Sequence, residues 1–125
     1  MKDGGALMNA VTGNWIKVGS VDEIPLSGAR RVAWGETKIA VFRTAAGSVH
    51  AIEDNCPHKS GPLSQGIVHD DCVTCPLHNW VISLETGKAQ GVDEGSVRTY
   101  RVLVNDLAEI LLCAEDLTPA PALRA

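Results

Sequence analysis

The chain has 125 residues, of which 45% are hydrophobic and 21% charged, and its formal net charge is −4 at pH 7. This is the composition of an ordinary globular protein, and the length suits one domain. The acidic balance argues against nucleic-acid binding, and no apolar run reaches the roughly 20 residues that a membrane span needs.

The fold class is predicted from alternating apolar and polar residues, interrupted at short intervals by turn residues. This pattern is typical of an all-β sandwich or barrel of antiparallel strands. Gly35-Glu36, Asp70-Asp71 and Asn105-Asp106 mark hairpin turns, and residues 21–25 form a connecting turn. The expected strands, in chain order, are 15–18, 30–34, 38–43, 48–53, 67–68, 72–74, 81–84, 97–104 and 107–112.

The order of these strands predicts a single domain, residues 14–113, with a small β unit inserted into a base. The base comprises residues 14–53 and 97–113, and the inserted unit comprises residues 54–96. Residues 1–13 and 114–125 are expected to be flexible tails. The first eleven residues lack the sustained apolar stretch of a signal peptide. The four cysteines form no recognisable disulfide framework, so we expect a cytoplasmic protein.

Two motifs in the inserted unit carry the chemistry: Cys56-Pro57-His58 and Cys75-Pro76-Leu77-His78, with sixteen residues between them. Each motif supplies one thiolate and one imidazole. If two loops bring them together, Cys56 and Cys75 can bind one iron and His58 and His78 the other, as in a Rieske 2Fe–2S cluster. These four residues are therefore the predicted metal and cofactor ligands.

A tetrahedral zinc site is the alternative, because two Cys and two His also form a zinc ligand set. Structural zinc motifs usually pair Cys with Cys and His with His, whereas each pair here is mixed. This difference favours iron, and an empty site is the third alternative. No catalytic residue set is recognisable, so catalysis by this chain alone is not expected.

The remaining cysteines and histidines are interpreted as structural. Cys72 and Cys75 have Cys-x-x-Cys spacing, but they lie in a β-branched stretch rather than at a helix start. Cys72 and Cys113 are therefore expected to be small buried side chains. His50 is expected half-exposed on a strand, and His69 beside a hairpin turn. Trp80, directly after the second motif, is expected to be a core aromatic that supports the loop.

The chain resembles the Rieske iron–sulfur family, and within it the small subunit of assimilatory NAD(P)H-dependent nitrite reductase. The resemblance extends from Trp15 to Leu112 and is carried by residues 15–18, 56–69, 75–81, 85–87, 93–95 and 98–100. It implies a Rieske-type β base with an inserted cluster-binding unit. It also implies ligation by Cys56, His58, Cys75 and His78. Val92 departs from the pattern, because related sequences often have proline there.

This resemblance implies an electron-transfer subunit in nitrate assimilation, paired with a large subunit that carries flavin and siroheme and reduces nitrite to ammonia. The alternative is a free Rieske ferredoxin that carries electrons from a flavin reductase to an aromatic-ring dioxygenase. The stretch from His78 to Tyr100 favours the nitrite reductase subunit, whereas the ligand motif does not separate the two.

A low midpoint potential is expected within the Rieske range of roughly −150 to +300 mV. The resemblance implies that high-potential members have a hydroxyl residue after the second motif and a disulfide between the loops. Here Asn79 and Trp80 follow His78, and neither loop has a spare cysteine. Glu53 and Asp54 also add negative charge near Cys56, which disfavours reduction.

Overall fold

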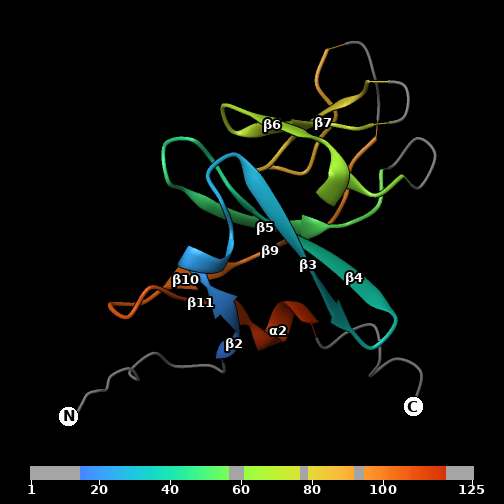
Figure 1. Ribbon diagram of the computed structural model, residues 1–125. Coiled ribbons are helices and arrows are strands. Elements are labelled where there is room, and N and C mark those ends of the chain that lie inside the picture. Colours follow the sequence, from blue (N-terminus) through green and yellow to red (C-terminus); the bar gives the residue numbers. More distant parts are fainter. Residues whose placement is uncertain (1–14, 57–60, 77–78, 92–94, 118–125) are drawn as a thin grey trace.

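The structure, a computed structural model, describes residues 15–56, 61–76, 79–91 and 95–117, and it is almost entirely β (Figure 1). The elements are β2 (Trp15–Ser20), η1 (Val21–Glu23), β3 (Gly28–Trp34), β4 (Thr37–Arg43), β5 (Val49–Glu53), η2 (Leu63–Gln65), β6 (Ile67–His69), β7 (Cys72–Thr74), β8 (Val81–Ser83), β9 (Thr99–Tyr100), β10 (Val102–Val104), β11 (Glu109–Cys113) and α2 (Ala114–Leu117). The predicted all-β fold class is confirmed. No helix among the described residues is long and apolar enough to cross a membrane.

Two antiparallel sheets form the lower part of the molecule in Figure 1. One has the strand order β3-β4-β5-β9 and the other the order β10-β11-β2. Apolar side chains from both sheets meet in one buried cluster, which therefore holds the two sheets together. Its buried members are Ile24, Ile39, Val41, Ala51, Tyr100, Ile110, Leu112 and Leu117.

Strand β4 connects this lower core to the part of the molecule that contains the predicted ligands. Successive residues of a strand point to opposite faces of its sheet. Ile39 and Val41 accordingly join the lower core, whereas Ala40 and Phe42 join a second buried cluster with Cys56 and Cys75. Because β4 is buried on both faces, its residues support the site and the base together.

The third sheet, of order β6-β7-β8, lies at the opposite end of the molecule from β2 and α2 (Figure 1). The predicted turn at residues 70–71 is confirmed: β6 and β7 pair across it, with Val68 opposite Val73. Gly66 packs tightly against β7, since a Cβ atom on Gly66 would lie 2.3 Å from the carbonyl oxygen of Thr74. The sheet therefore needs glycine at this position.

The predicted strand 97–104 is wrong in one respect, because it is two strands that belong to different sheets. Thr99–Tyr100 pairs with β5, and Val102–Val104 pairs with β11. The break falls at Arg101, whose backbone N–H donates to Asp116 Oδ2 at 2.7 Å instead of to a strand. This change of sheet closes the base.

The segment 114–117, expected within the C-terminal tail, forms the short helix α2. Leu117 is buried in the lower core, and the Asp116 carboxylate accepts hydrogen bonds from Arg101 Nε at 3.2 Å and Nη2 at 3.0 Å. The helix is therefore held by the burial of Leu117 and by ion pairs from Arg101 to Asp116 and, at 3.5 Å, to Glu115. Residues 118–125 lie outside the described part of the chain.

We expect the Arg101–Asp116 pair to make stability depend on pH at the acidic end. The hydrogen bonds from Arg101 lower the pKa of Asp116 below its usual value of 3.8. A carboxyl group with a lowered folded-state pKa stabilises the fold above its unfolded-state pKa, and this contribution disappears as the pH falls through the folded-state value. Asp116→Asn should therefore cost about 1–2 kcal/mol at pH 7 and much less near pH 2.

Urea titration of both proteins at the two pH values measures this difference. An equal cost at pH 2 and pH 7 would show that the carboxylate charge does not contribute.

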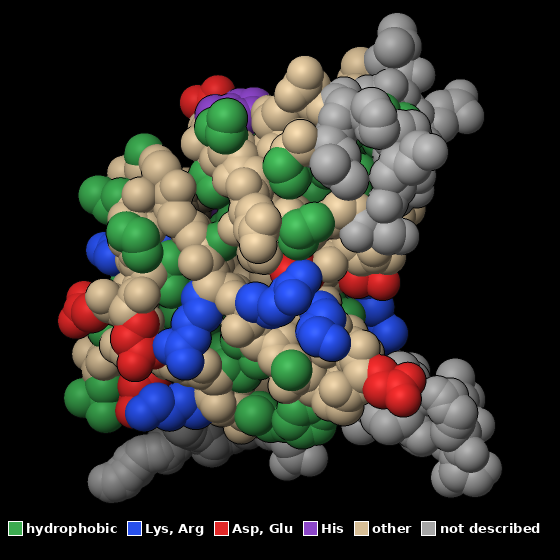
Figure 2. Space-filling view, turned by 45° about the vertical axis from the view of Figure 1, so that its right-hand side comes forward, with side chains coloured by type: hydrophobic (Ala, Val, Ile, Leu, Met, Phe, Trp, Pro, Cys, Tyr) green, Lys and Arg blue, Asp and Glu red, His purple; other side chains and the backbone are tan. Residues whose placement is uncertain are grey.

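Charged side chains are unevenly distributed on the surface. Figure 2 shows Lys and Arg side chains across the middle of one face and Asp and Glu side chains mostly near its edges. Several cations of the base are paired: Lys17 with Glu109 at 3.0 Å, Arg30 with Glu23, and Arg31 with Asp54 at 2.6 Å. The first two pairs lie at the surface of the base, whereas the third reaches a buried carboxylate beside Cys56.

Candidate metal centre

Both predicted sulfur ligands are buried in the structure. Cys56 follows the end of β5 and is 1% exposed, and Cys75 directly follows β7 and is 0% exposed. The four cysteines form no disulfide with one another. The two predicted nitrogen ligands, His58 and His78, lie outside the described residues. The sulfur half of the predicted site can therefore be described directly.

Each of these cysteines stands at the start of a loop that is closed by its own backbone N–H. Cys56 N donates to Gly61 O at 2.8 Å, and Cys75 N donates to Trp80 O at 2.7 Å. In both loops the acceptor lies five residues after the cysteine, so the two motifs have the same closure. This repetition fits two loops that present equivalent ligands to a common centre.

The surroundings of the two thiols are apolar. Cys56 and Cys75 belong to one buried cluster, and Trp80 packs against it, as expected for a core aromatic. An apolar shell limits the access of water to a metal centre and thereby influences its redox potential. The other buried members of the cluster are Ala40, Phe42, Ile52, Leu63, Val68, Val73, Ile82, Leu84 and Val97.

The residue after the second motif has an unusual backbone conformation. Asn79 has φ of 59°, in the left-handed region, which Asn tolerates better than most other residues. Its conformation precedes Trp80, whose carbonyl closes the second loop. The backbone conformation therefore gives a local reason for asparagine at position 79, where the resemblance implies a hydroxyl residue in high-potential members.

A buried carboxylate lies two residues before Cys56. The Asp54 side chain is 0% exposed and pairs with Arg31 Nε at 2.6 Å. It also accepts hydrogen bonds from Ser64 N and Ser64 Oγ, both at 2.7 Å. The sequence identified Asp54 only as a nearby negative charge and did not identify Arg31 or Ser64. Because Arg31 faces the carboxylate, its charge is compensated locally.

The other cysteines and histidines lie near their expected positions. Cys113 is 5% exposed, as expected for a small buried side chain. Cys72 is only half-buried rather than fully buried, and burial together with the carboxylates of Asp70, Asp71 and Glu85 raises the pKa of its thiol. A raised thiol pKa keeps Cys72 protonated at neutral pH and therefore unreactive.

The two described histidines have other neighbours than the thiols. His50 lies on β5, half-buried, with its Nε2 3.5 Å from Asp71 Oδ1. His69 ends β6, and its Nε2 lies 2.6 Å from Thr74 Oγ1. Among the described residues, no three His, Cys, Asp or Glu side chains are arranged to hold a metal ion. The two predicted histidine ligands, at positions 58 and 78, lie outside that part of the chain.

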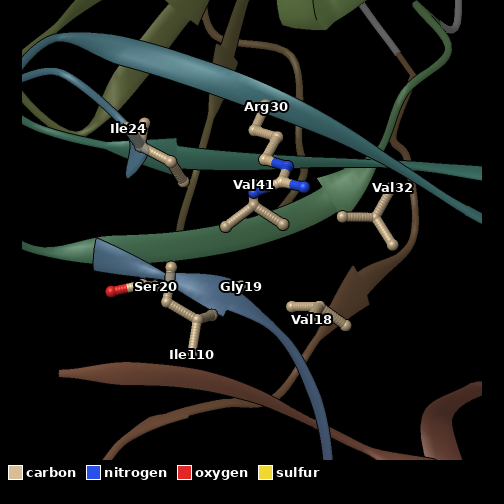
Figure 3. Close-up of a pocket in the computed structure, with 8 residues that line it drawn as sticks. All are labelled: Val18, Gly19, Ser20, Ile24, Arg30, Val32, Val41 and Ile110. Carbon is tan, nitrogen blue, oxygen red and sulfur yellow. The ribbon is translucent and has the colours of Figure 1, made fainter. Parts of the chain in front are cut away.

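A crevice in the base is too narrow to be a ligand site. It lies between β2 and the strands β3 and β4, where Val18, Val32, Val41 and Ile110 point toward one another (Figure 3). These side chains leave about 0 Å³ for the centre of a water molecule. The crevice is part of the packing between the two base sheets.

Comparison with known proteins agrees with this description of an all-β protein. The model of the Rieske [2Fe-2S] domain matches residues 14–101. The chain belongs to the Rieske [2Fe-2S] family, and its cofactor is a Rieske-type 2Fe–2S cluster that transfers electrons.

Curated relatives include both short ferredoxins and much longer enzymes. The chain is 38% identical over 103 residues to the ferredoxin subunit of anthranilate 1,2-dioxygenase from Burkholderia cepacia, covering 80% of this chain and 93% of that protein. It is 53% identical over 47 residues to 4beta-methylsterol monooxygenase from Methylococcus capsulatus. That match covers 38% of this chain and 12% of the longer enzyme, so it concerns one segment only.

Solved structures with the same fold include ferredoxins and nitrite reductase small subunits of similar length. The ferredoxin of carbazole 1,9a-dioxygenase from Nocardioides aromaticivorans matches with a TM-score of 0.72 and 26% identity, covering 81% of this chain and 98% of that chain. A chain assigned as the small subunit of NADH-dependent nitrite reductase from Mycobacterium tuberculosis matches with a TM-score of 0.72 and 25% identity, covering 79% and 93%. The fold is therefore common to both classes.

Proposed function

We propose that Cys56 and Cys75 bind one iron of the cluster and that His58 and His78 bind the other. Two ferric ions, two sulfides and two thiolates sum to zero charge, so an electron enters this cluster more easily than an all-cysteine cluster. The burial of both thiols and the matching closure of their loops support this assignment. Under this proposal, the cluster-binding unit is the inserted unit, residues 54–96.

We further propose that the chain is the small subunit of a cytoplasmic NAD(P)H-dependent nitrite reductase. The observation that carries this proposal is the resemblance of the segment from Trp15 to Leu112 to the small subunit of assimilatory NAD(P)H-dependent nitrite reductase. The part of this segment after the second ligand motif carries most of the argument. In that segment Gly87 has φ of 77°, and a Cβ atom there would lie 2.3 Å from Val97 O. The turn Glu85-Thr86-Gly87 therefore requires glycine at its third position. The backbone N–H groups of Glu85 and Thr86 both donate to Ser83 Oγ, which fixes the start of the turn.

In this proposal the chain relays electrons, while the large subunit binds NAD(P)H and nitrite. The chain's own residues hold the cluster loops in place, exclude water from the sulfur ligands and provide the surface that meets the partner. The structural likeness to a chain assigned as a nitrite reductase small subunit supports the proposal.

The second candidate is a free Rieske ferredoxin that reduces an aromatic-ring dioxygenase. It is favoured by the 38% identity to the ferredoxin subunit of anthranilate 1,2-dioxygenase over 93% of that protein. The two candidates differ in how the chain meets its partner. A subunit remains in a stable complex, whereas a ferredoxin binds reductase and oxygenase in turn.

Stopped-flow reoxidation distinguishes the candidates. The dithionite-reduced chain is mixed with a large nitrite reductase subunit that carries flavin and siroheme, in the presence of nitrite. In parallel it is mixed with the oxygenase component of anthranilate 1,2-dioxygenase. We expect at least tenfold faster reoxidation by the nitrite reductase subunit and co-elution of the two chains in gel filtration. Faster reoxidation by the oxygenase, without a stable complex, would favour the ferredoxin.

A further inference from the structure

We propose that Asp54, held by Arg31 and Ser64, is the positioning residue of the first ligand loop and that Arg31 adjusts the redox potential of the centre. The inference rests on the proposed ligation by Cys56, but it holds for either candidate partner. It concerns residues outside the four predicted ligands.

The Asp54 carboxylate is bound more completely than a surface ion pair requires. It accepts from Arg31 Nε at 2.6 Å, from Ser64 N at 2.7 Å and from Ser64 Oγ at 2.7 Å, and its side chain is 0% exposed. A buried carboxylate is tolerated only when it is paired and hydrogen-bonded. Removing one partner therefore leaves a charge that the protein no longer compensates.

These contacts lie on both sides of the first ligand loop. Asp54 precedes Cys56 by two residues, and Ser64 follows Gly61 by three. The backbone bond from Cys56 N to Gly61 O closes the loop, and the Asp54–Ser64 bonds close it a second time further from the ligand. Asp54 N also donates to Lys38 O at 2.8 Å, which anchors the start of the loop on β4. The carboxylate thus fixes both ends of the loop to the base.

Arg31 adds an electrostatic component to this arrangement. It comes from β3, which is an edge strand of its sheet, and its side chain is 46% exposed while its partner is fully buried. A negative charge on a residue two positions before a proposed iron ligand opposes the arrival of an electron, and the guanidinium offsets that charge. The midpoint potential of the centre should therefore fall when Arg31 loses its charge and rise when Asp54 loses its charge.

The adjacent Arg30 provides a matched control. It lies on the same strand and pairs with Glu23, whose side chain is 52% exposed, not with Asp54. Arg30→Gln and Arg31→Gln remove the same charge from neighbouring positions. Any difference between them reports the contact with Asp54 and not the net charge of the protein.

The experiment uses anaerobically purified holoprotein and has two readouts: the midpoint potential from a redox titration, and the rate of iron loss to an excess of chelator. We expect Arg31→Gln to lower the midpoint and to speed iron loss at least fivefold, with Arg30→Gln unchanged in both. Asp54→Asn should raise the midpoint and speed iron loss. Ser64→Ala should speed iron loss and leave the midpoint near that of the wild type.

The conservative variant Arg31→Lys separates charge from geometry. It should restore the midpoint, because the positive charge returns. It should restore iron retention only in part, because an ammonium does not reproduce the planar guanidinium. If Asp54→Asn does not fold, the Arg31 and Ser64 variants test the proposal by themselves.

The proposal is overturned if Arg31→Gln and Arg30→Gln give the same midpoint and the same rate of iron loss. It is also overturned if Asp54→Asn folds and keeps both wild-type values. Failure of the ligand assignment is a distinct outcome, in which Cys56→Ala keeps its iron. Failure of the proposed partner would leave all of these readouts unchanged.

Discussion

Cys75→Ala is expected to yield a protein without the cluster, lacking its visible absorption and holding less than a tenth of the wild-type iron. The Cys75 thiolate is a predicted iron ligand, and alanine has no group that can bind iron. Cys75 is 0% exposed and belongs to the group of buried apolar side chains that also contains Cys56. Burial of the thiol therefore limits the access of solvent that could take its place. Iron and acid-labile sulfide assays on the purified variant measure the effect.

Cys72→Ala is the matched control, because Cys72 lies three residues earlier and is not one of the predicted ligands. It is half-buried, and the raised pKa of its thiol is that of a protonated structural side chain. This variant should retain iron at the wild-type level. Equal iron in Cys75→Ala and the wild type would contradict the ligand assignment, and loss of iron in Cys72→Ala would bring that residue into the site.

Gly66→Ala is expected to destabilise the fold through a steric clash alone, because the backbone at Gly66 has an ordinary negative φ. The added Cβ would lie 2.3 Å from Thr74 O and 2.8 Å from Val73 Cγ2, so β7 would have to move. Overpacking of this kind costs about 3 kcal/mol. Since Thr74 immediately precedes Cys75, the movement should also speed iron loss from the holoprotein. Urea denaturation and chelator treatment measure the two effects.

Gly47→Ala serves as the control for Gly66→Ala. Gly47 has φ of 95°, but a Cβ atom there would meet nothing within 4 Å. The substitution should therefore cost only the backbone strain, about 1–2 kcal/mol, and leave iron retention unchanged. A smaller cost for Gly66→Ala than for Gly47→Ala would show that β7 adapts easily and that the close approach does not constrain the second loop.

Much of the fold was predictable because most strands are defined locally. The hairpin β3–β4 is marked by the turn residues Gly35-Glu36 between two apolar-containing stretches, and the structure pairs Trp34 with Thr37 as that turn requires. The motif spacing alone predicts Cys56 and Cys75 as ligands, and the structure buries both in one apolar cluster. Sequence therefore predicts those features of the fold that are set by residues close together in the chain.

The features that sequence did not predict depend on contacts between distant segments. Arg101 looks like any residue in a strand, and only its bond to Asp116 divides the segment between two sheets. Leu117 lies in a segment that the sequence predicts to be a tail, and only its burial in the lower core shows that the segment belongs to the fold. Likewise, Arg31 and Ser64 are separated from Asp54 by 23 and 10 residues, so no spacing rule connects them.

The partner of the chain is a separate problem from its fold. A dioxygenase ferredoxin and a chain assigned as a nitrite reductase small subunit both match at a TM-score of 0.72, so the fold does not separate the two candidates. Local compensation of Asp54 by Arg31 also means that the expected low potential depends mainly on Glu53 and on the missing hydroxyl after His78.

The central claim is that this chain carries a cluster with mixed cysteine and histidine ligands. Electron paramagnetic resonance of the dithionite-reduced protein, purified without oxygen and assayed for iron, sulfide and zinc, tests it most directly. We predict two irons and two sulfides per chain and a rhombic signal whose average g value is lower than that of all-cysteine ferredoxins. A colourless protein that holds zinc, or that takes up no iron and sulfide on reconstitution, would contradict the claim.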